Sequence, residues 1–259
     1  MKFNNNVIRT YGAVVVLLLL LTVIVSYQTN TVPVATLVAV PVAVAFNFCI
    51  TRGYFKSRSK FPFSAIITSM IVTLVIPQST SLLIVICAVT LAELSKSFIK
   101  LKSKNIFNPA AIGLVFLAVF GVNPAPFSWV NANSVYLLYL SLPLLLLVGL
   151  AIYSVKRAPI SLSFGITFLF LSIISLGLVK GFSITWMSIL LLSGYYSIAF
   201  VMLSDPKTSP KETWVQCVYG CGTAFLTFIF SIIGLSFAFP ISLLLGNLTY
   251  AVHKPIKKK

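Results

Sequence analysis

Carboxylates are the scarcest chemically active groups in this chain, and their positions limit the chemistry that it can perform. The 259 residues include only three acids, Glu93, Asp205 and Glu212. A carboxylate in apolar surroundings is costly unless it is paired or binds a cation. Glu93 precedes Lys96 by three residues, which leaves two hypotheses open. It forms an ion pair along one helix face, or it is a cation or proton ligand facing a bundle interior. Glu212 falls between apolar runs, so we expect it to be solvated.

A polar turn follows a long apolar run at residues 204–210, with the sequence Ser-Asp-Pro-Lys-Thr-Ser-Pro. Pro206 disfavours helical geometry at Asp205, which is therefore expected to be extended. The Asp205 carboxylate can then accept hydrogen bonds from N–H groups of the turn that follows. The segment is interpreted either as a helix terminator or as part of a ligand site. In the second case the candidate binding residues are Ser204, Asp205 and Thr208.

A second polar segment covers residues 104–113, with the sequence Lys-Asn-Ile-Phe-Asn-Pro-Ala-Ala-Ile-Gly. Asn108 is a good N-cap and Pro109 suits the first helical position, so a helix is predicted to begin here. Its free N–H groups lie beside a cluster of four lysines and would attract an anion such as a flavin phosphate, a nucleotide or a lipid headgroup. The alternative is a well-capped helix with no ligand. Lys104 and Asn105 complete the candidate binding set with Asn108 and Pro109.

Several kinds of catalytic site are absent from the sequence. The only histidine is His253 in the basic tail, so no histidine is placed to activate a serine or threonine. No glycine-rich phosphate loop is present. Cys217 and Cys221 share a helix face, which would suit half of a shared metal site or simple packing. We expect no resident metal and no self-contained hydrolytic chemistry.

The elements that position these residues are apolar segments. The chain is 59% hydrophobic and 8% charged, with a mean hydropathy of +1.05. A helix needs about 20 residues to span a bilayer, so about ten spans use most of the chain. We therefore predict an all-α polytopic membrane protein in which residues 1–259 form a single transmembrane domain. The ten apolar runs are 11–27, 33–50, 61–77, 81–95, 108–122, 134–153, 159–179, 184–203, 214–235 and 238–252.

The basic residues alternate along this series. Eighteen of the nineteen lysines and arginines lie before the first run or after an even-numbered run, and only Lys180 lies elsewhere. Positive charge marks the cytoplasmic side, so both termini of this multi-pass protein are predicted to be cytoplasmic and its location the plasma membrane. The net charge of +16 is dispersed over short loops. It therefore indicates contact with the lipid bilayer and its headgroups, and no nucleic-acid partner is expected.

Ten helices divide into two groups of five. Because five is odd, the second half would enter the membrane with opposite topology, as in transporters built from inverted repeats. The predicted halves are 1–122 and 134–253. The fifth run of each half is short and contains proline, which would place a binding site between the halves.

The two polar segments together resemble the RnfD and NqrB family of membrane subunits. Residues 104–113 are similar to the family pattern N-x-F-N-P-A-A-x-G, and residues 202–210 to T-D-P-x-T-S-P. Weaker matches occur at 64–68, 159–164 and 245–247, and the resemblance covers about residues 60–250. It implies two five-helix halves and flavin-linked electron transfer coupled to Na⁺ or H⁺ movement. It also implies other membrane subunits as partners in a larger electron-transport complex.

One departure from the family concerns the cofactor. The family carries Ser-Gly-Ala-Thr after the fifth helix, where the threonine holds FMN through a phosphoester. Residues 123–133 contain no such motif and no threonine. Covalent FMN is therefore not expected, whereas non-covalent FMN or riboflavin remains compatible with the resemblance. The alternative function is a stand-alone transporter or channel for a small solute on the same fold, and a membrane scaffold without chemistry is a third hypothesis. Whether the chain is a redox or a non-catalytic subunit of a translocase stays open.

Overall fold

The chain folds mainly into helices. The computed structural model describes residues 5–29, 32–54, 62–77, 79–101, 104–122, 149, 156–179, 194–235 and 237–253. Its α-helices are α1 (Asn5–Thr29), α2 (Val34–Phe48), α3 (Phe63–Val75), α4 (Leu82–Phe98), α5 (Pro109–Val119), α7 (Ala158–Val179), α9 (Gly194–Leu203), α10 (Thr213–Ile232) and α11 (Ala238–His253). They follow the predicted apolar runs where these are described. The sixth run, 134–153, lies almost wholly outside the described residues, as does the first half of the eighth, 184–203.

Length and surface composition identify a helical membrane protein. Three described segments are long and apolar enough to cross a bilayer, namely Val34–Thr51, Ala158–Ser175 and Thr213–Ile232. Helix α7 also exposes large apolar side chains at every fourth position, Leu162, Ile166, Phe170 and Ile174. Residues four apart share a helix face, so these side chains form one apolar stripe. Water would disfavour such a stripe, whereas lipid solvates it.

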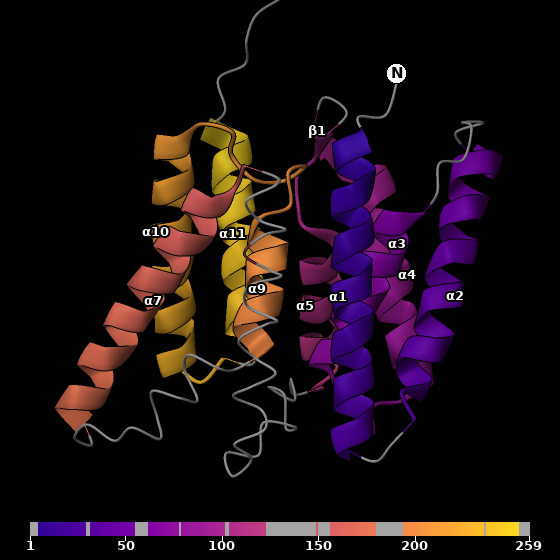
Figure 1. The fold of residues 1–259 in the computed structure, drawn as a ribbon, viewed down its shortest axis with the longest axis horizontal. Helices are drawn as coiled ribbons and strands as arrows, with labels where there is room; N and C mark the ends of the chain where they lie inside the picture. The colour runs from indigo at the N-terminus through magenta and orange to yellow at the C-terminus, as the bar shows by residue number, and fades with distance from the viewer. Residues whose placement is uncertain are drawn as a thin grey trace, which may run out of the picture.

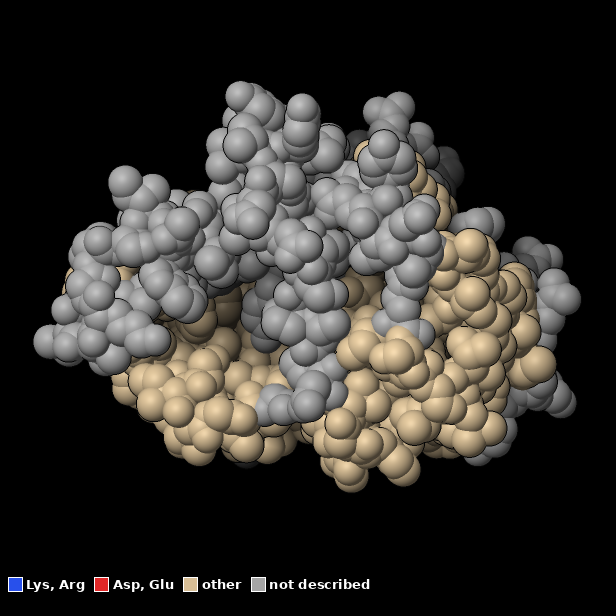
Figure 2. Space-filling model, turned by 90° about the horizontal axis from the view of Figure 1, so that it is seen from below, with Lys and Arg blue, Asp and Glu red and all other residues tan. Residues whose placement is uncertain are grey.

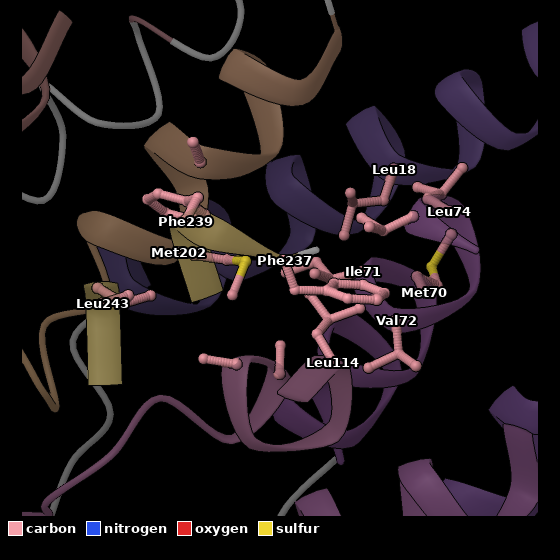
Figure 3. Packing of buried hydrophobic residues seen from close by; sticks show 14 of the residues in the cluster. Leu18, Met70, Ile71, Val72, Leu74, Leu114, Met202, Phe237, Phe239 and Leu243 are labelled. Atoms are coloured by element: carbon pink, nitrogen blue, oxygen red, sulfur yellow. The ribbon is translucent and has the colours of Figure 1, made fainter. Parts of the chain in front are cut away.

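The helices form two groups that meet at a shared core (Figure 1). Helices α1 to α4 lie to the right in this view, α7, α10 and α11 lie to the left, and α5 and α9 lie between them. Contact between α5 and α11 joins the groups. A continuous cluster of buried side chains runs through both, and Figure 3 labels Ile71 of α3, Leu114 of α5 and Phe237 before α11 among its members.

Among the described residues, charge gathers at one end, here named the basic end. It holds the start of α1, the segment from the end of α4 to the start of α5, the start of α7, the turn between α9 and α10, and the end of α11 (Figure 1). Figure 2 shows the opposite end, where no charged side chain is visible among the described residues. This arrangement agrees with the alternation of basic residues along the sequence.

Two local features depart from the all-helical prediction. The loop after α4 contains a two-stranded antiparallel pair, β1 (Lys100–Leu101) and β2 (Lys104–Asn105), in which Lys100 is paired with Asn105. Helix α2 continues into a short π-helix, η1 (Cys49–Tyr54). The Thr51 hydroxyl donates to the Asn47 carbonyl at 2.8 Å. Such side-chain bonds compete with the helical ladder and favour local distortion.

Candidate functional site

The N-terminus of α5 is closed by its own cap. The Asn108 side-chain oxygen accepts hydrogen bonds from the backbone N–H groups of Ala110 at 3.0 Å and Ala111 at 3.4 Å, and Pro109 occupies the first helical turn. The predicted N-cap is therefore confirmed. It has a consequence for ligand binding, because two of the N–H groups that an anion would need are already satisfied.

The Asn108 amide also connects the two polar segments. Its Nδ2 donates to the Met202 carbonyl at 3.0 Å, in the last turn of α9. Asn108 is only 4% exposed, so this bond forms away from solvent. One side chain therefore caps α5 with its oxygen and holds the end of α9 with its nitrogen. The structure thus brings together the start of α5 and the end of α9, which are far apart in sequence.

The turn after α9 is rigid and internally bonded. The Asp205 Oδ1 atom accepts a hydrogen bond from the Lys207 N–H at 3.1 Å, which confirms the bond predicted from the Asp-Pro step. The Asp205 carbonyl accepts from the N–H groups of Thr208 and Ser209 at 3.2 and 3.0 Å, and from the Ser209 hydroxyl at 2.7 Å. Because these bonds fix the backbone, the Asp205 carboxylate is held at the basic end in a half-buried position.

The other predicted site residues are distributed around this junction. Pro109, Ser204 and Thr208 are buried, and the Ser204 hydroxyl donates to the Val201 carbonyl of its own helix at 3.3 Å. Lys104 and Asn105 lie in β2, and Asn105 is half-buried. No described contact joins β2 to the Asp205 turn. The structure therefore unites Asn108 with the end of α9 and leaves Lys104 and Asn105 in the adjoining hairpin.

The Asp205 charge influences residues from both groups of helices. Tyr11 of α1, Lys96 of α4 and Tyr219 of α10 all experience its field. Arg157, immediately before α7, experiences it as well. Burial lowers the pKa of the Arg157 guanidinium, and the nearby Tyr250 and Asp205 counteract part of this shift. The Asp205 carboxylate therefore lies within electrostatic range of residues from both groups of helices.

Glu93 forms the ion pair that was one of its two predicted roles. Its Oε1 atom pairs with the Lys96 ammonium, and its Oε2 atom accepts from the Asn47 amide of α2 at 3.1 Å. Lys96 also donates to the Ser64 carbonyl of α3 at 2.8 Å. The pair is buried within the protein, since Glu93 is 1% exposed. It joins α2, α3 and α4 through satisfied polar groups. Glu212, by contrast, is exposed as predicted.

Four buried polar side chains were not predicted as site residues. Within the described part of the chain, one atom of each has no hydrogen-bond partner: Nε of Arg157, Oγ of Ser161, Oε1 of Gln216 and Nδ2 of Asn247. Gln216 and Asn247 were detectable as amides inside apolar runs. Arg157 was detectable from the step Arg-Ala-Pro at the start of a run, which resembles the Asn-Pro start of α5.

The described residues hold no group of three histidine, cysteine or acidic side chains that could bind a metal ion. Comparison with known proteins gives no family for this chain. No protein-family model matches the sequence, and no curated protein is significantly similar to it. The candidate site must therefore be interpreted from its own geometry: a capped helix start, a rigid acidic turn and a buried arginine at one end of a helical membrane protein.

Proposed function

We propose that this chain is a membrane subunit of an electron-transport complex of the RnfD and NqrB kind. In such a complex, flavin-linked electron transfer drives Na⁺ or H⁺ across the plasma membrane. One observation carries the proposal, namely the hydrogen bond from the Asn108 amide to the Met202 carbonyl. It joins, across 94 residues, the two segments on which the sequence resemblance rests. Chance similarity of two short motifs gives no reason for them to meet in space.

The proposal includes ten membrane spans in two inverted five-helix halves, with both termini in the cytoplasm. Helix packing supports the repeat, because three of the helix pairs in contact in the first half recur between the corresponding helices of the second. The pair α2–α4 corresponds to α7–α10, α4–α5 to α10–α11, and α2–α3 to α7–α9. In each half, a glycine of the fifth helix packs against the fourth. Gly113 of α5 faces Ala88 of α4, and Gly246 of α11 faces Thr223 of α10.

The residues at the junction are compatible with a non-covalent flavin, either FMN or riboflavin. The Asp205 carboxylate is half-buried and has hydrogen-bonding capacity beyond its single bond from Lys207. It can accept from a flavin N–H or ribityl hydroxyl, and exposed lysines nearby suit a phosphate. A bound flavin would supply one- and two-electron transfer. Asp205 would orient it, while Asn108 would keep α5 and α9 in register. Other membrane subunits would carry the remaining redox centres.

The test is a visible spectrum and flavin extraction of the purified full-length protein. We expect about one flavin per chain in the wild type and little in Asp205→Asn, which removes the charge but keeps the shape. The matched control is Glu212→Gln, which neutralises an exposed acid seven residues away and should retain flavin. Asn108→Asp keeps the cap oxygen but loses the donor to Met202, so it should lower flavin content while α5 stays folded. A wild-type protein without flavin would refute the proposal.

The alternative is a stand-alone transporter or channel for a small solute. The buried Glu93–Lys96 pair and its Asn47 contact favour it, because ionisable groups inside membrane helices often line solute or ion pathways. Reconstituted vesicles would separate the two functions. Uptake of neutral or anionic solutes by flavin-free protein, lost in Glu93→Gln, would support transport. No uptake of any solute tested would exclude it.

A further inference from the structure

The start of α7 contains two buried polar groups that the proposed function does not use. Arg157 and Ser161 are each 6% exposed. The Arg157 Nε and the Ser161 Oγ find no hydrogen-bond partner within the described residues. The two residues are four positions apart and therefore lie on the same side of the first turn. A buried donor without a partner is costly, so two such groups within about one helical turn point to a ligand that both could contact.

The charge of Arg157 has no counter-ion in the protein. The chain has three acidic side chains, and all three are described. Glu93 is taken by Lys96, and Glu212 is exposed at the start of α10. Asp205 is close enough for its field to act on Arg157, yet no ion pair joins the two. A buried guanidinium without a counter-ion is strongly unfavourable, so Arg157 calls for an anion that the described residues do not supply.

The surroundings of Arg157 suit an oxyanion. Helix α7 is 22 residues long, and the positive end of its dipole lies beside Arg157. Gln216 of α10 donates to the Lys156 carbonyl at 3.5 Å and so brings α10 against this end. Tyr250 of α11 is near enough to influence the guanidinium. The site therefore lies among three helices at the basic end, where positive charge would attract anionic headgroups.

We propose that Arg157, Ser161 and the first turn of α7 bind one phosphate group, supplied by an anionic lipid or by a free phosphorylated molecule. Arginine presents a planar fork of donors that matches phosphate oxygens. The Ser161 hydroxyl adds a neutral donor one turn further along. This site differs from the Lys104–Pro109 segment, where Asn108 already satisfies the helix start. It does not depend on the proposed redox function, because a flavin-free transporter would carry the same unpaired arginine.

The experiment uses the full-length protein, delipidated in a neutral detergent. Three probes are added separately: phosphatidylglycerol, phosphatidylcholine and inorganic phosphate. Binding is measured by native mass spectrometry and by the shift in thermal unfolding midpoint. We expect phosphatidylglycerol or inorganic phosphate to bind and stabilise the wild type. Arg157→Gln should weaken that binding about tenfold or more, because it removes a charge-assisted bond. Ser161→Ala should weaken it a few-fold. The matched control, Lys211→Gln, removes an exposed charge near the same end and should change little.

The probes also identify the source of the phosphate. A response to phosphatidylglycerol alone assigns a lipid, and a response to inorganic phosphate assigns a free phosphorylated molecule. If Arg157→Gln does not fold, Arg157→Lys and Ser161→Ala decide the question, since both should bind more weakly than wild type. The proposal is overturned if no probe stabilises the wild type, if phosphatidylcholine acts as strongly as phosphatidylglycerol, or if the Arg157 and Ser161 variants respond like Lys211→Gln.

Discussion

Gly220 is the position at which the packing of the second helix group can be tested most directly. It lies on α10 where that helix crosses α7. A Cβ atom added there would lie 2.1 Å from the Ser163 hydroxyl oxygen and 2.5 Å from the Ile160 carbonyl oxygen. Ordinary contact begins at 3.4 Å. The serine can rotate away, but the carbonyl belongs to the α7 backbone, so Gly220→Ala must push the two helices apart by nearly an ångström.

The magnitude follows from two opposing terms. Overpacking a tight contact costs about 1–3 kcal/mol, and the upper end applies because backbone opposes the new methyl group. Replacing a helical glycine by alanine contributes about 1 kcal/mol in the other direction. The net loss is about 2 kcal/mol, which for a chain of this size lowers the unfolding midpoint by roughly 4–8 °C.

Gly222 provides the matched control two residues away on the same helix. Its added Cβ would meet nothing within 4 Å. Gly222→Ala should therefore leave the midpoint unchanged or raise it slightly, because alanine adds up to about 1 kcal/mol to the free energy of unfolding. Both variants are compared with wild type by thermal unfolding in detergent, followed by size-exclusion chromatography. Equal midpoints for the two variants would show that α7 and α10 do not cross at Gly220, and the described packing of this helix group would be wrong.

Three further predictions concern buried polar groups and orientation. Glu93→Gln should destabilise the protein by about 3–5 kcal/mol, because it leaves the Lys96 ammonium buried without its counter-ion. Adding Lys96→Met should restore most of the loss in the same unfolding assay. A single variant as stable as wild type would contradict the pairing. Tyr219→Phe removes the hydroxyl that donates to the side chain of Asn247, a fully buried residue, and should lower the free energy of unfolding by about 1–3 kcal/mol. Adding Asn247→Leu should recover part of that loss. A double variant no more stable than Tyr219→Phe would refute the coupling. Lys207→Cys in a cysteine-free background should react with an impermeant maleimide only after cells are opened, and labelling of intact cells would reverse the predicted orientation.

Helix positions could be predicted from the sequence because a membrane span requires a continuous run of apolar residues, which is visible without knowledge of the fold. The seventh run was predicted at 159–179 and α7 covers Ala158–Val179, while the tenth was predicted at 238–252 and α11 covers Ala238–His253. The end of α2 was less accurate. Hydropathy continues to residue 50, but the Thr51 hydroxyl bonds back to the Asn47 carbonyl and the helix becomes a π-helix. Hydropathy contains no information about such competing bonds.

The candidate site was predictable only where its interactions are local. The Asn108 cap and the Asp205 turn each involve neighbours within a few residues, so residue preferences predicted both. The bond from Asn108 to Met202 spans 94 residues, and no local rule predicts it. Arg157 was interpreted simply as one of many topology signals. Its burial depends on α10 and α11, which pack against the start of α7 from positions far along the chain.

The helices α5 and α7 both begin near a proline at the basic end, yet the polar residue before each helix differs in charge and in how its hydrogen bonds are satisfied. At α5 the Asn108 side chain is neutral and satisfies its own helix and α9 at once. At α7 the residue before the helix is a charged arginine whose Nε atom finds no hydrogen-bond partner within the described residues. A neutral amide can be satisfied within a protein, whereas a buried cation needs an anion. The lysine-rich segment before α5 was the expected anion site, but the physical demand for an anion is stronger at Arg157. Anion binding at the basic end is therefore expected to follow the arginine rather than the lysines.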